Sequence, residues 1–253
     1  MEEAKYFLDL CNAALIATGT VKAQHVQTIS DQVGVPSFIF NSTQSLGSYE
    51  PTFVLESDDQ RDSINMEKGF VLLYTSGTTG PPKGILHSRR SAVVGFQSLM
   101  NKMAMSPRDT WLLQSPVHWM GGFFQFFITV SAGACAEFCA SAFTPDWLLE
   151  RLSAGDVSCL HLTPILLDTV EEKLHVARNA WPSSRYESVL AGLRGIRVLA
   201  VGSVPVGSVR RTAWKNLRGG KPLMVLYGMT EELGMVARSS WESDDDIPLV
   251  EPL

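Results

Sequence analysis

The residues with the clearest chemical purpose lie between Tyr74 and Gly84, where the sequence reads YTSGTTGPPKG. Hydroxyl side chains alternate there with glycines, which allow the backbone to approach an anion closely and to direct N–H groups at it. Lys83 adds a mobile positive charge suited to a polyphosphate. The segment is not a Walker A loop, because Gly84 stands where that loop needs serine or threonine after the lysine. It therefore predicts a phosphate-binding loop rather than a flexible turn rich in glycine and threonine.

A second pattern, YGMTE, runs from Tyr227 to Glu231. A tyrosine ring can stack on a flat base, and Gly228 leaves room for the base to approach the backbone. The Thr230 hydroxyl can bind a phosphate oxygen, and the Glu231 carboxylate can hold Mg²⁺, with Glu232 as a less favoured ligand. A turn between a strand and a helix would look similar, so this pattern gains its weight from following the first one in the same chain.

The two patterns together resemble the signature motifs of the adenylate-forming superfamily, which includes acyl-CoA synthetases, luciferases and the adenylation domains of peptide synthetases. The resemblance implies a mobile loop that closes over the β- and γ-phosphates of ATP, with Lys83 as a catalytic charge. The loop residues implied in nucleotide binding are Thr75, Ser76, Gly77, Thr78, Thr79, Gly80 and Lys83.

For the second motif, the resemblance implies that the Tyr227 ring packs on adenine, beside Gly228 and Met229 of the nucleotide site. Thr230 would contact the α-phosphate and Glu231 would bind Mg²⁺, so both are implied catalytic residues. Peptide-synthetase adenylation domains usually carry proline at the position of Met229. The wording of the motif therefore favours the acyl-CoA synthetase branch.

A third segment, VGSVP from Val201 to Pro205, follows a predicted strand. It resembles the turn of small residues that borders both the adenine and the acyl pocket in the family. The resemblance implies that Gly202 and Ser203 line the nucleotide. An ordinary turn before a helix fits these residues equally well, and only the position ahead of Tyr227 favours a site.

A fourth segment, SPVHWMGG from Ser115 to Gly122, resembles the family pattern Pro-x-x-His-x-x-Gly, in which an aromatic or histidine side chain gates the acyl pocket. Trp119 takes the gating position here, and Gly121 leaves room in the pocket beside it. His118 comes one residue earlier, so its implied contact with substrate competes with a purely structural role. The remaining histidines match no motif and are interpreted as structural: His25, His87, His161 and His175.

The chemistry that the resemblance implies is ATP-dependent activation of a small carboxylic acid. The acid attacks the α-phosphorus, which gives an acyl-AMP and pyrophosphate, and the thiol of coenzyme A then displaces AMP. Positioning and charge stabilisation by Mg²⁺, Lys83 and the hydroxyl loop would suffice, without a protein nucleophile. Family members that act on malonate-type diacids tend to place arginine just before the tyrosine. Leu226 occupies that position and cannot pair with a second carboxylate, so a monocarboxylic acid is favoured.

The elements that must position these residues alternate between strands and helices. Strands are predicted over 13–18, 36–40, 70–74, 157–162, 196–201 and 222–227, and helices over 21–33, 88–100, 144–154, from 163 and over 208–217. Periodicity leaves 123–130 open between helix and strand. The alternation predicts an α/β fold with mostly parallel sheets covered by helices, and ligands then bind at the carboxyl ends of strands.

The resemblance assigns residues 1–253 to part of the large N-terminal domain of an adenylate-forming enzyme. We expect a strand–helix–strand segment at 1–60, a polar connection at 41–66 and an ATP-binding core at 67–240. The Thr-Gly-Asp motif and the C-terminal domain with the catalytic lysine are not found in the sequence. Two hypotheses therefore stay open, an acyl-activating ligase or its core, and a non-catalytic nucleotide-binding relic. A peptide-synthetase adenylation domain would need a carrier domain, which the sequence does not show.

Composition excludes several other classes of protein. The 253 residues carry a net charge of −5, without the clustered lysines and arginines that nucleic acids require. The apolar stretch from 120 to 136 is interrupted by Gly, Gln, Thr and Ser, so no transmembrane segment is expected. The four cysteines lack zinc-site spacing and suit a reducing compartment. The acidic start Met1-Glu2-Glu3 is unlike a signal peptide, so a cytoplasmic location is expected, with targeting to an organelle left open.

Overall fold

The computed structural model describes residues 2–40, 64–75, 80–139, 143–238 and 251–252. The connection predicted at 41–66 therefore lies almost wholly outside the described residues. Contacts divide the chain into two compact units, residues 1–66 with 77–84 and residues 67–76 with 85–253.

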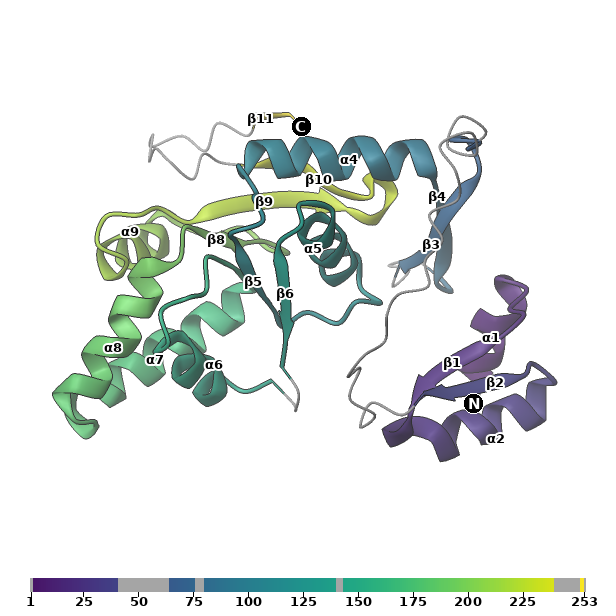
Figure 1. Cartoon of the computed structure of the whole chain (residues 1–253), viewed down its shortest axis with the longest axis horizontal. Coiled ribbons are helices and arrows are strands. Elements are labelled where there is room, and N and C mark those ends of the chain that lie inside the picture. The colour runs from purple at the N-terminus through teal and green to yellow at the C-terminus, as the bar shows by residue number, and fades with distance from the viewer. Residues whose placement is uncertain (1, 41–63, 76–79, 140–142, 239–250, 253) are drawn as a thin grey trace. The chain divides into compact units, whose positions relative to one another are not determined.

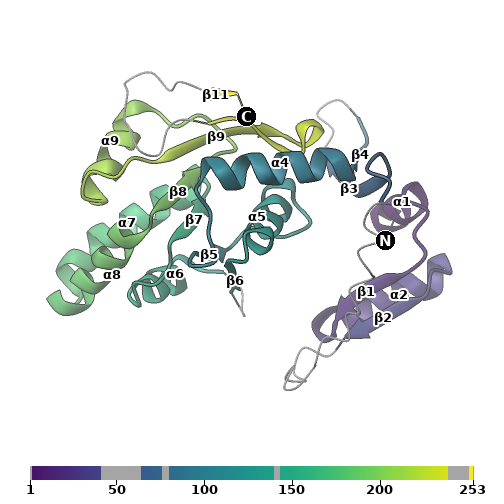
Figure 2. The same cartoon turned by 45° about the horizontal axis from the view of Figure 1, so that its top comes forward.

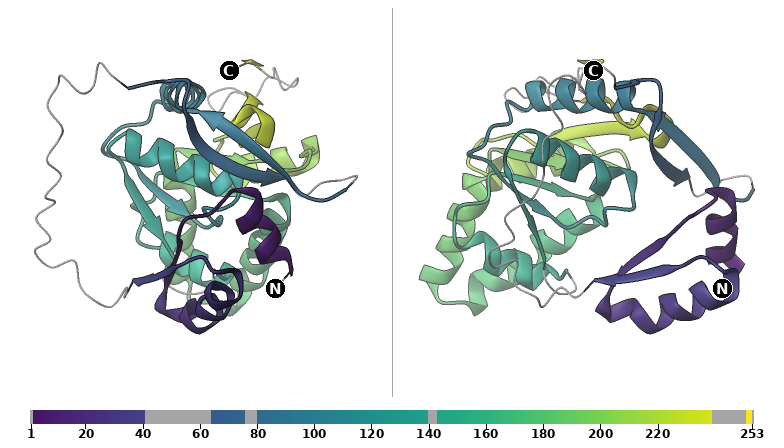
Figure 3. Two further views of the ribbon diagram at one scale, coloured as in Figure 1. Left: turned by 90° about the vertical axis from the view of Figure 1, so that its right-hand side faces the viewer. Right: turned by 45° about the vertical axis from the view of Figure 1, so that its right-hand side comes forward.

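The first unit contains the strand, helix and strand that the sequence predicts. Strand β1 (Ile16–Gly19) leads through a turn of 3-10 helix (Thr20–Lys22) into helix α2 (Ala23–Val33), and strand β2 (Ser37–Phe40) pairs with β1 in parallel. Figure 3 shows the two strands side by side with α2 along them. Helix α1 (Glu2–Leu10) precedes these elements and is not among the predicted ones.

The second unit holds most of the strands. Its strands are β3 (Gly69–Thr75), β5 (Thr110–Leu113), β6 (Cys135–Phe138), β7 (Cys159–Leu162), β8 (Val198–Val201), β9 (Met224–Met229), β10 (Gly234–Arg238) and β11 (Glu251–Pro252). Strand β4 (Lys83–Ser88) begins at the division between the units and pairs with β3 in a two-stranded sheet. Its helices are α4 (Arg89–Lys102), α5 (Met120–Ser131), α6 (Pro145–Leu152), α7 (Pro164–Ala180), α8 (Ser183–Gly195), α9 (Ser208–Leu217) and the 3-10 turn η2 (Thr230–Glu232).

A seven-stranded sheet forms the centre of this unit, in the spatial order β11-β10-β9-β8-β7-β5-β6. The five strands from β9 to β6 run parallel, whereas β10 pairs antiparallel with β9 and with β11. Parallel strands need long crossover connections, and helices supply them here. The α/β fold with a mostly parallel sheet is therefore confirmed (Figure 1).

Alternation along the strands gives the sheet two buried faces. Leu160 and Leu199 pack against helices α6, α7, α8 and α9, whereas their neighbours Cys159 and Ala200 pack against α4 and α5. Helices α6, α7, α8 and α9 lie together in Figures 1 and 2. Because both faces are covered, the strands are apolar almost throughout, as expected for a parallel sheet.

Helices α6 and α7 begin where the sequence predicts. The side chains of Thr144 and Thr163 accept hydrogen bonds from the N–H groups of Trp147 at 3.2 Å and Leu166 at 3.4 Å. A proline follows each threonine at the start of the helix. These are the N-cap and first-turn preferences that satisfy otherwise unpaired N–H groups.

Helix α5 resolves the segment that periodicity left open, because residues 123–130 all lie within it. Phenylalanine rings join this helix to β3 and α4. Phe70 of β3 contacts Phe127 edge-on, with ring centroids 5.5 Å apart, and Phe127 stacks on Phe96 of α4 at 5.6 Å. The strand that leads into the predicted phosphate-binding loop is thereby fixed to both helices. Among the described helices, none has the length and apolarity needed to cross a membrane.

A polar network joins the amino-terminal ends of the parallel strands. Asp109, which is 6% exposed, accepts hydrogen bonds from the Ser158 hydroxyl at 2.7 Å and from Arg197 Nη2 at 2.8 Å. Burial raises the pKa of Asp109, but the hydrogen bonds from Arg197, Ser158 and the N–H of Ser106 outweigh it and lower the pKa below its ordinary value. The network lies before β5, β7 and β8, so it fixes the sheet at the end opposite to the candidate site.

Candidate active site

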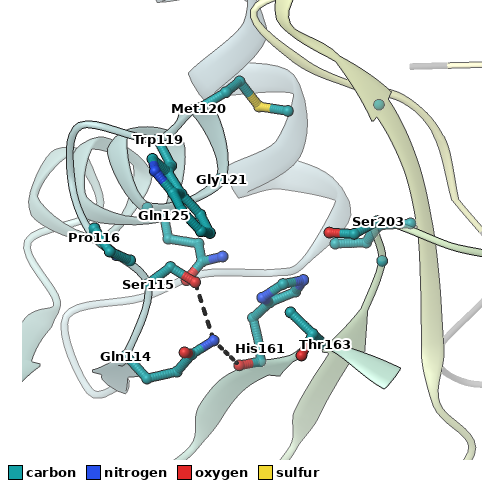
Figure 4. A pocket seen from close by; sticks show the side chains of 14 residues that line it. Gln114, Ser115, Pro116, Trp119, Met120, Gly121, Gln125, His161, Thr163 and Ser203 are labelled. Carbon is teal, nitrogen blue, oxygen red and sulfur yellow. Dashed lines mark hydrogen bonds between the residues drawn. The ribbon is translucent and has the colours of Figure 1, made fainter. Parts of the chain in front are cut away.

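A cavity of about 180 Å³ opens at the carboxyl ends of the parallel strands (Figure 4). Strands β5, β7, β8 and β9 and the first turns of helix α5 supply its wall. The lining residues are Gln114, Ser115, Pro116, Trp119, Met120, Gly121, Gly122, Gln125, His161, Thr163, Gly202, Ser203, Leu226 and Gly228. The cavity occupies the end of the sheet at which α/β folds bind their ligands.

The structure brings together several predicted residues that are distant in sequence. Trp119 and Gly121 come from the predicted acyl-pocket segment, Gly202 and Ser203 from the turn after β8, and Gly228 from the second motif. All five line the same cavity. The predicted segments are therefore neighbours in space.

His118 does not share this position. Its side chain is exposed, and its ring stands edge-on to Trp119, with centroids 6.1 Å apart. It is not among the described residues that line the cavity. A contact between His118 and substrate stays a prediction.

The turn after β8 approaches the backbone of β9 closely. Ser203 adopts φ of 79°, in the left-handed region that few residues other than glycine enter. A Cβ atom on Gly202 would lie 3.1 Å from the main-chain oxygen of Leu226. Glycine at 202 lets the ends of β8 and β9 approach closely. The Ser203 backbone adopts a sparsely populated conformation of the kind that occurs at functional sites.

The second motif bends at the end of β9. Tyr227 is 61% exposed and Met229 ends the strand, after which Thr230 and Glu231 begin the turn η2. Glu231 is exposed and Thr230 is half-buried. The Tyr227 ring and the Glu231 carboxylate are therefore available to a ligand, and the Thr230 side chain is partly so.

The first motif is described only at its ends. Thr75 is the last residue of β3, and Lys83 is the exposed first residue of β4. Gly80 is exposed, with open space where a Cβ atom would project. The predicted nucleotide contacts of Ser76, Gly77, Thr78 and Thr79 lie outside the described residues.

The two buried polar residues of the lining, His161 and Gln125, are absent from the sequence-based candidates. His161 was interpreted as structural, yet it lines the cavity from the end of β7, and Gln125 faces it from α5 (Figure 4). The signal for His161 is a polar residue within the buried strand CLHL, at the carboxyl end of that strand. Gln125 gives no comparable signal, because a single polar residue in an apolar helix has many structural uses.

The cavity is lined without formal positive charge. Burial lowers the pKa of His161 to about 4, so its imidazole is neutral near pH 7. None of the described lining residues is a lysine or an arginine. The groups offered to a ligand inside the cavity are therefore neutral donors and acceptors.

The described residues contain no preformed metal cage. No three His, Cys, Asp or Glu side chains within the ranges given above gather in a way that could hold an ion. A single exposed carboxylate such as Glu231 nevertheless suits Mg²⁺, which keeps several waters and commonly binds one or two carboxylates together with substrate phosphates. The residues present fit a metal that arrives with a nucleotide.

Comparisons with known proteins agree with this geometry. A family model described as "AMP-binding enzyme" matches residues 1–251. An acyl-CoA ligase of Aspergillus oryzae is 25% identical over 91% of this chain and 42% of its own length. A mitochondrial malonate–CoA ligase of Xenopus laevis is 26% identical over 92% of this chain and 40% of its own length.

Solved structures share the fold. The ATP-bound MatB of Rhodopseudomonas palustris superimposes with a TM-score of 0.72 at 19% identity, over 98% of this chain and 46% of that one. The o-succinylbenzoate CoA synthetase of Bacillus subtilis, in complex with its acyl-adenylate intermediate, gives 0.67 at 18% identity, over 94% of this chain and 43% of that one. The present chain thus spans about two fifths of the length of the curated relatives named above.

Proposed function

Because this chain belongs to the AMP-binding enzyme family, we propose that it binds ATP and activates a small carboxylic acid as an acyl-AMP, in the manner of an acyl-CoA synthetase. The observation that carries the proposal is the cavity at the carboxyl ends of the strands, where the turn after β8 and the second motif on β9 meet. The reaction needs the nucleotide and the acid to touch, and this cavity brings the segments predicted to bind each of them together.

The nucleotide is assigned to the strand ends. Tyr227 offers an exposed ring to adenine, and Gly202, Ser203 and Gly228 form the backbone surface beside it. Met229 completes this surface. Aromatic stacking combined with close backbone approach recognises a flat base without formal charge.

The phosphates are assigned to the first motif and the turn η2. Lys83 supplies positive charge, and Thr75, Ser76, Thr78 and Thr79 supply hydroxyl donors, with Gly77 and Gly80 between them. Thr230 contacts the α-phosphate and Glu231 holds Mg²⁺. These groups stabilise the charge that develops on phosphate oxygens during the attack.

The acid is assigned to the remaining cavity, between Trp119 and Gly121 of α5 and the ends of β7 and β8. Its carboxylate oxygen attacks the α-phosphorus and pyrophosphate departs, which leaves the acyl-AMP. The thiol of coenzyme A then attacks the acyl carbon, and AMP leaves with the electron pair of the broken bond. Leu226 lines the cavity where a paired arginine would serve a second carboxylate, which supports a monocarboxylic acid.

The test is calorimetric titration of the chain with ATP and Mg²⁺, compared with the double variant Lys83→Ala, Glu231→Ala. Lys22→Ala, Glu187→Ala is the matched control, since it removes the same two charges from exposed positions on other elements. Saturable binding that only the first double variant loses supports the proposal. A folded chain that binds no ATP would overturn it.

Release of pyrophosphate on addition of carboxylic acids then separates two possibilities. Turnover that depends on the acid identifies a ligase. Binding of ATP without turnover favours the alternative, a non-catalytic nucleotide-binding protein of the same family.

A further inference from the structure

Two buried polar side chains in the cavity have no hydrogen-bond partner within the described part of the chain. Gln125 is 2% exposed, and neither its amide oxygen nor its amide nitrogen is paired. His161 is 7% exposed, and its Nδ1 atom is unpaired. Buried polar groups are almost always paired in folded proteins, so each exception calls for a reason.

The neighbouring Gln114 shows what a structural glutamine looks like here. Its Nε2 atom donates to Ser115 Oγ at 3.0 Å and to the main-chain oxygen of His161 at 3.1 Å. The bond to His161 ties the end of β5 to the end of β7 (Figure 4). Gln125 lines the same cavity and its side chain makes no hydrogen bond. Its amide can therefore pair with a ligand in the cavity.

A glycine stands near each of the two side chains. A Cβ atom on Gly121 would lie 3.8 Å from Gln125 Nε2, and one on Gly202 would lie 3.7 Å from His161 Nε2. Neither glycine therefore carries a side chain that could cover these two nitrogen atoms. In Figure 4 the Gln125 and His161 side chains project into the space between α5 and Ser203.

The chemistry of the two groups is neutral. An amide and a neutral imidazole each offer one kind of donor and one kind of acceptor, and burial keeps His161 uncharged near pH 7. With no lysine or arginine among the described lining residues, a second carboxylate would enter without a counter-charge. A hydroxyl or a carbonyl group would satisfy both residues without that cost.

We propose that Gln125 and His161 are specificity-determining residues, which select a short carboxylic acid bearing a neutral hydrogen-bonding group, such as a hydroxyl, remote from its reacting carboxylate. The orientation of the acid in the cavity rests on the proposed function, since its reacting carboxylate must lie near the nucleotide at the ends of β8 and β9. The remote group then lies toward α5. The cavity of about 180 Å³ has room for a small acid.

The test compares 4-hydroxybutanoate with pentanoate, which has the same number of non-hydrogen atoms, and with succinate, which adds a second charge. Binding of each acid to the chain is followed by ligand-observed NMR titration, with and without ATP and Mg²⁺. We expect 4-hydroxybutanoate to bind at least about tenfold more tightly than pentanoate, because pentanoate leaves the buried groups unpaired. Equal affinities for the two acids, or tighter binding of succinate, would overturn the proposal, as would failure of all three to bind.

Variants locate the preference. In Gln125→Met and in His161→Leu we expect the preference to fall to less than about threefold, whereas Gln97→Met on the exposed side of α4 retains it. Both variants should also melt at or above the temperature of the wild type, since an unpaired buried group is removed. A lower melting temperature with an unchanged preference would show a structural role instead.

ATP binding, measured in parallel, separates this proposal from the proposed function. If the chain prefers the hydroxy acid but binds no ATP, the specificity proposal stands and the proposed ATP-dependent function is overturned. If the chain binds ATP but shows no preference between the acids, the proposed function stands and the specificity proposal is overturned.

Discussion

The Nε2 atom of His87 lies 2.7 Å from the main-chain oxygen of Thr230. A carbonyl can only accept, so Nε2 carries the proton and donates. His87 is 6% exposed and belongs to β4, the strand that follows the predicted phosphate-binding loop. Thr230 opens the turn of the second motif. One buried hydrogen bond therefore connects the strand after the first motif to the backbone of the second.

Replacement of His87 tests this connection. We expect His87→Ala to weaken ATP binding by about three- to tenfold, the effect of one net hydrogen bond, because the Thr230 turn loses its anchor. Titration with ATP and Mg²⁺ measures the effect. His175→Ala, on an exposed position of α7, is the control and should leave the affinity unchanged. Equal affinities in both variants would show that the bond does not position the motif.

Gly122 provides a second prediction, on stability. A Cβ atom there would lie 2.2 Å from the main-chain oxygen of Pro116, so α5 can start only where glycine allows this contact. We expect Gly122→Ala to destabilise the chain by about 1–3 kcal/mol, as for other overpacked sites. Urea denaturation followed by circular dichroism measures this. Gly121→Ala is the control, because its Cβ would meet only the Gln125 side chain at 3.8 Å. Equal midpoints for the two variants would contradict the steric explanation.

The network around Asp109 predicts a dependence of stability on pH. The pKa of this carboxyl is lower in the folded chain than in the unfolded one. Its contribution is therefore complete above the unfolded value, about 3.9, and is lost as the pH falls through the lowered folded value. Asp109→Asn should remove about 1–3 kcal/mol near pH 7 and flatten the loss of stability at acid pH.

Denaturation midpoints across the acid range check this expectation. Asp146→Asn is the matched control, since its carboxylate is 72% exposed in a surface pair with Lys173. Such pairs contribute little, so the control should follow the wild type. If both variants showed the same pH profile, the buried network would not be the source of the acid sensitivity.

The cysteines predict an order of thiol modification. Burial raises the pKa of Cys159 to about 12, whereas Cys11 and Cys135 are exposed. Because the thiolate is the reactive form, iodoacetamide at pH 8 should label Cys11 and Cys135 first and Cys159 only after unfolding. Mass spectrometry of the labelled peptides gives the order. Early labelling of Cys159 in the native chain would show that the sheet opens at β7.

Sequence reasoning predicted the elements with strong local signals. Threonine followed by proline marked the starts of α6 and α7, and the continuous apolar runs of β7 and β8 were recognised as buried strands. Strand β5, which reads TWLL, and β6, which reads CAEF, were not predicted. They are no shorter than β7 and β8, but neither was part of a longer predicted strand such as 157–162 or 196–201, and pairing in the sheet is what makes them strands.

The site was predicted where a motif is contiguous and missed where it depends on packing. Gly202, Ser203 and Gly228 were predicted because short segments carry them, and all three line the cavity. Gln125 and His161 become neighbours only when α5 lies over the end of β7, a long-range contact with no trace in local sequence. The structural interpretation of His161 followed from the lack of a motif around it. His161 lines the cavity, and its contact with a ligand stays a prediction.

The alternation of side chains along β7 has a consequence for how readily this pocket can be altered. Leu160 and Leu162 belong to the aliphatic layer under α6, α7 and α8, while His161 projects from the opposite side of the same strand. Position 161 can therefore change in size and polarity without disturbing that layer. Directed evolution of the acid preference should tolerate uncharged side chains of similar size at the buried positions 125 and 161, and a library restricted in this way would keep most of its members folded.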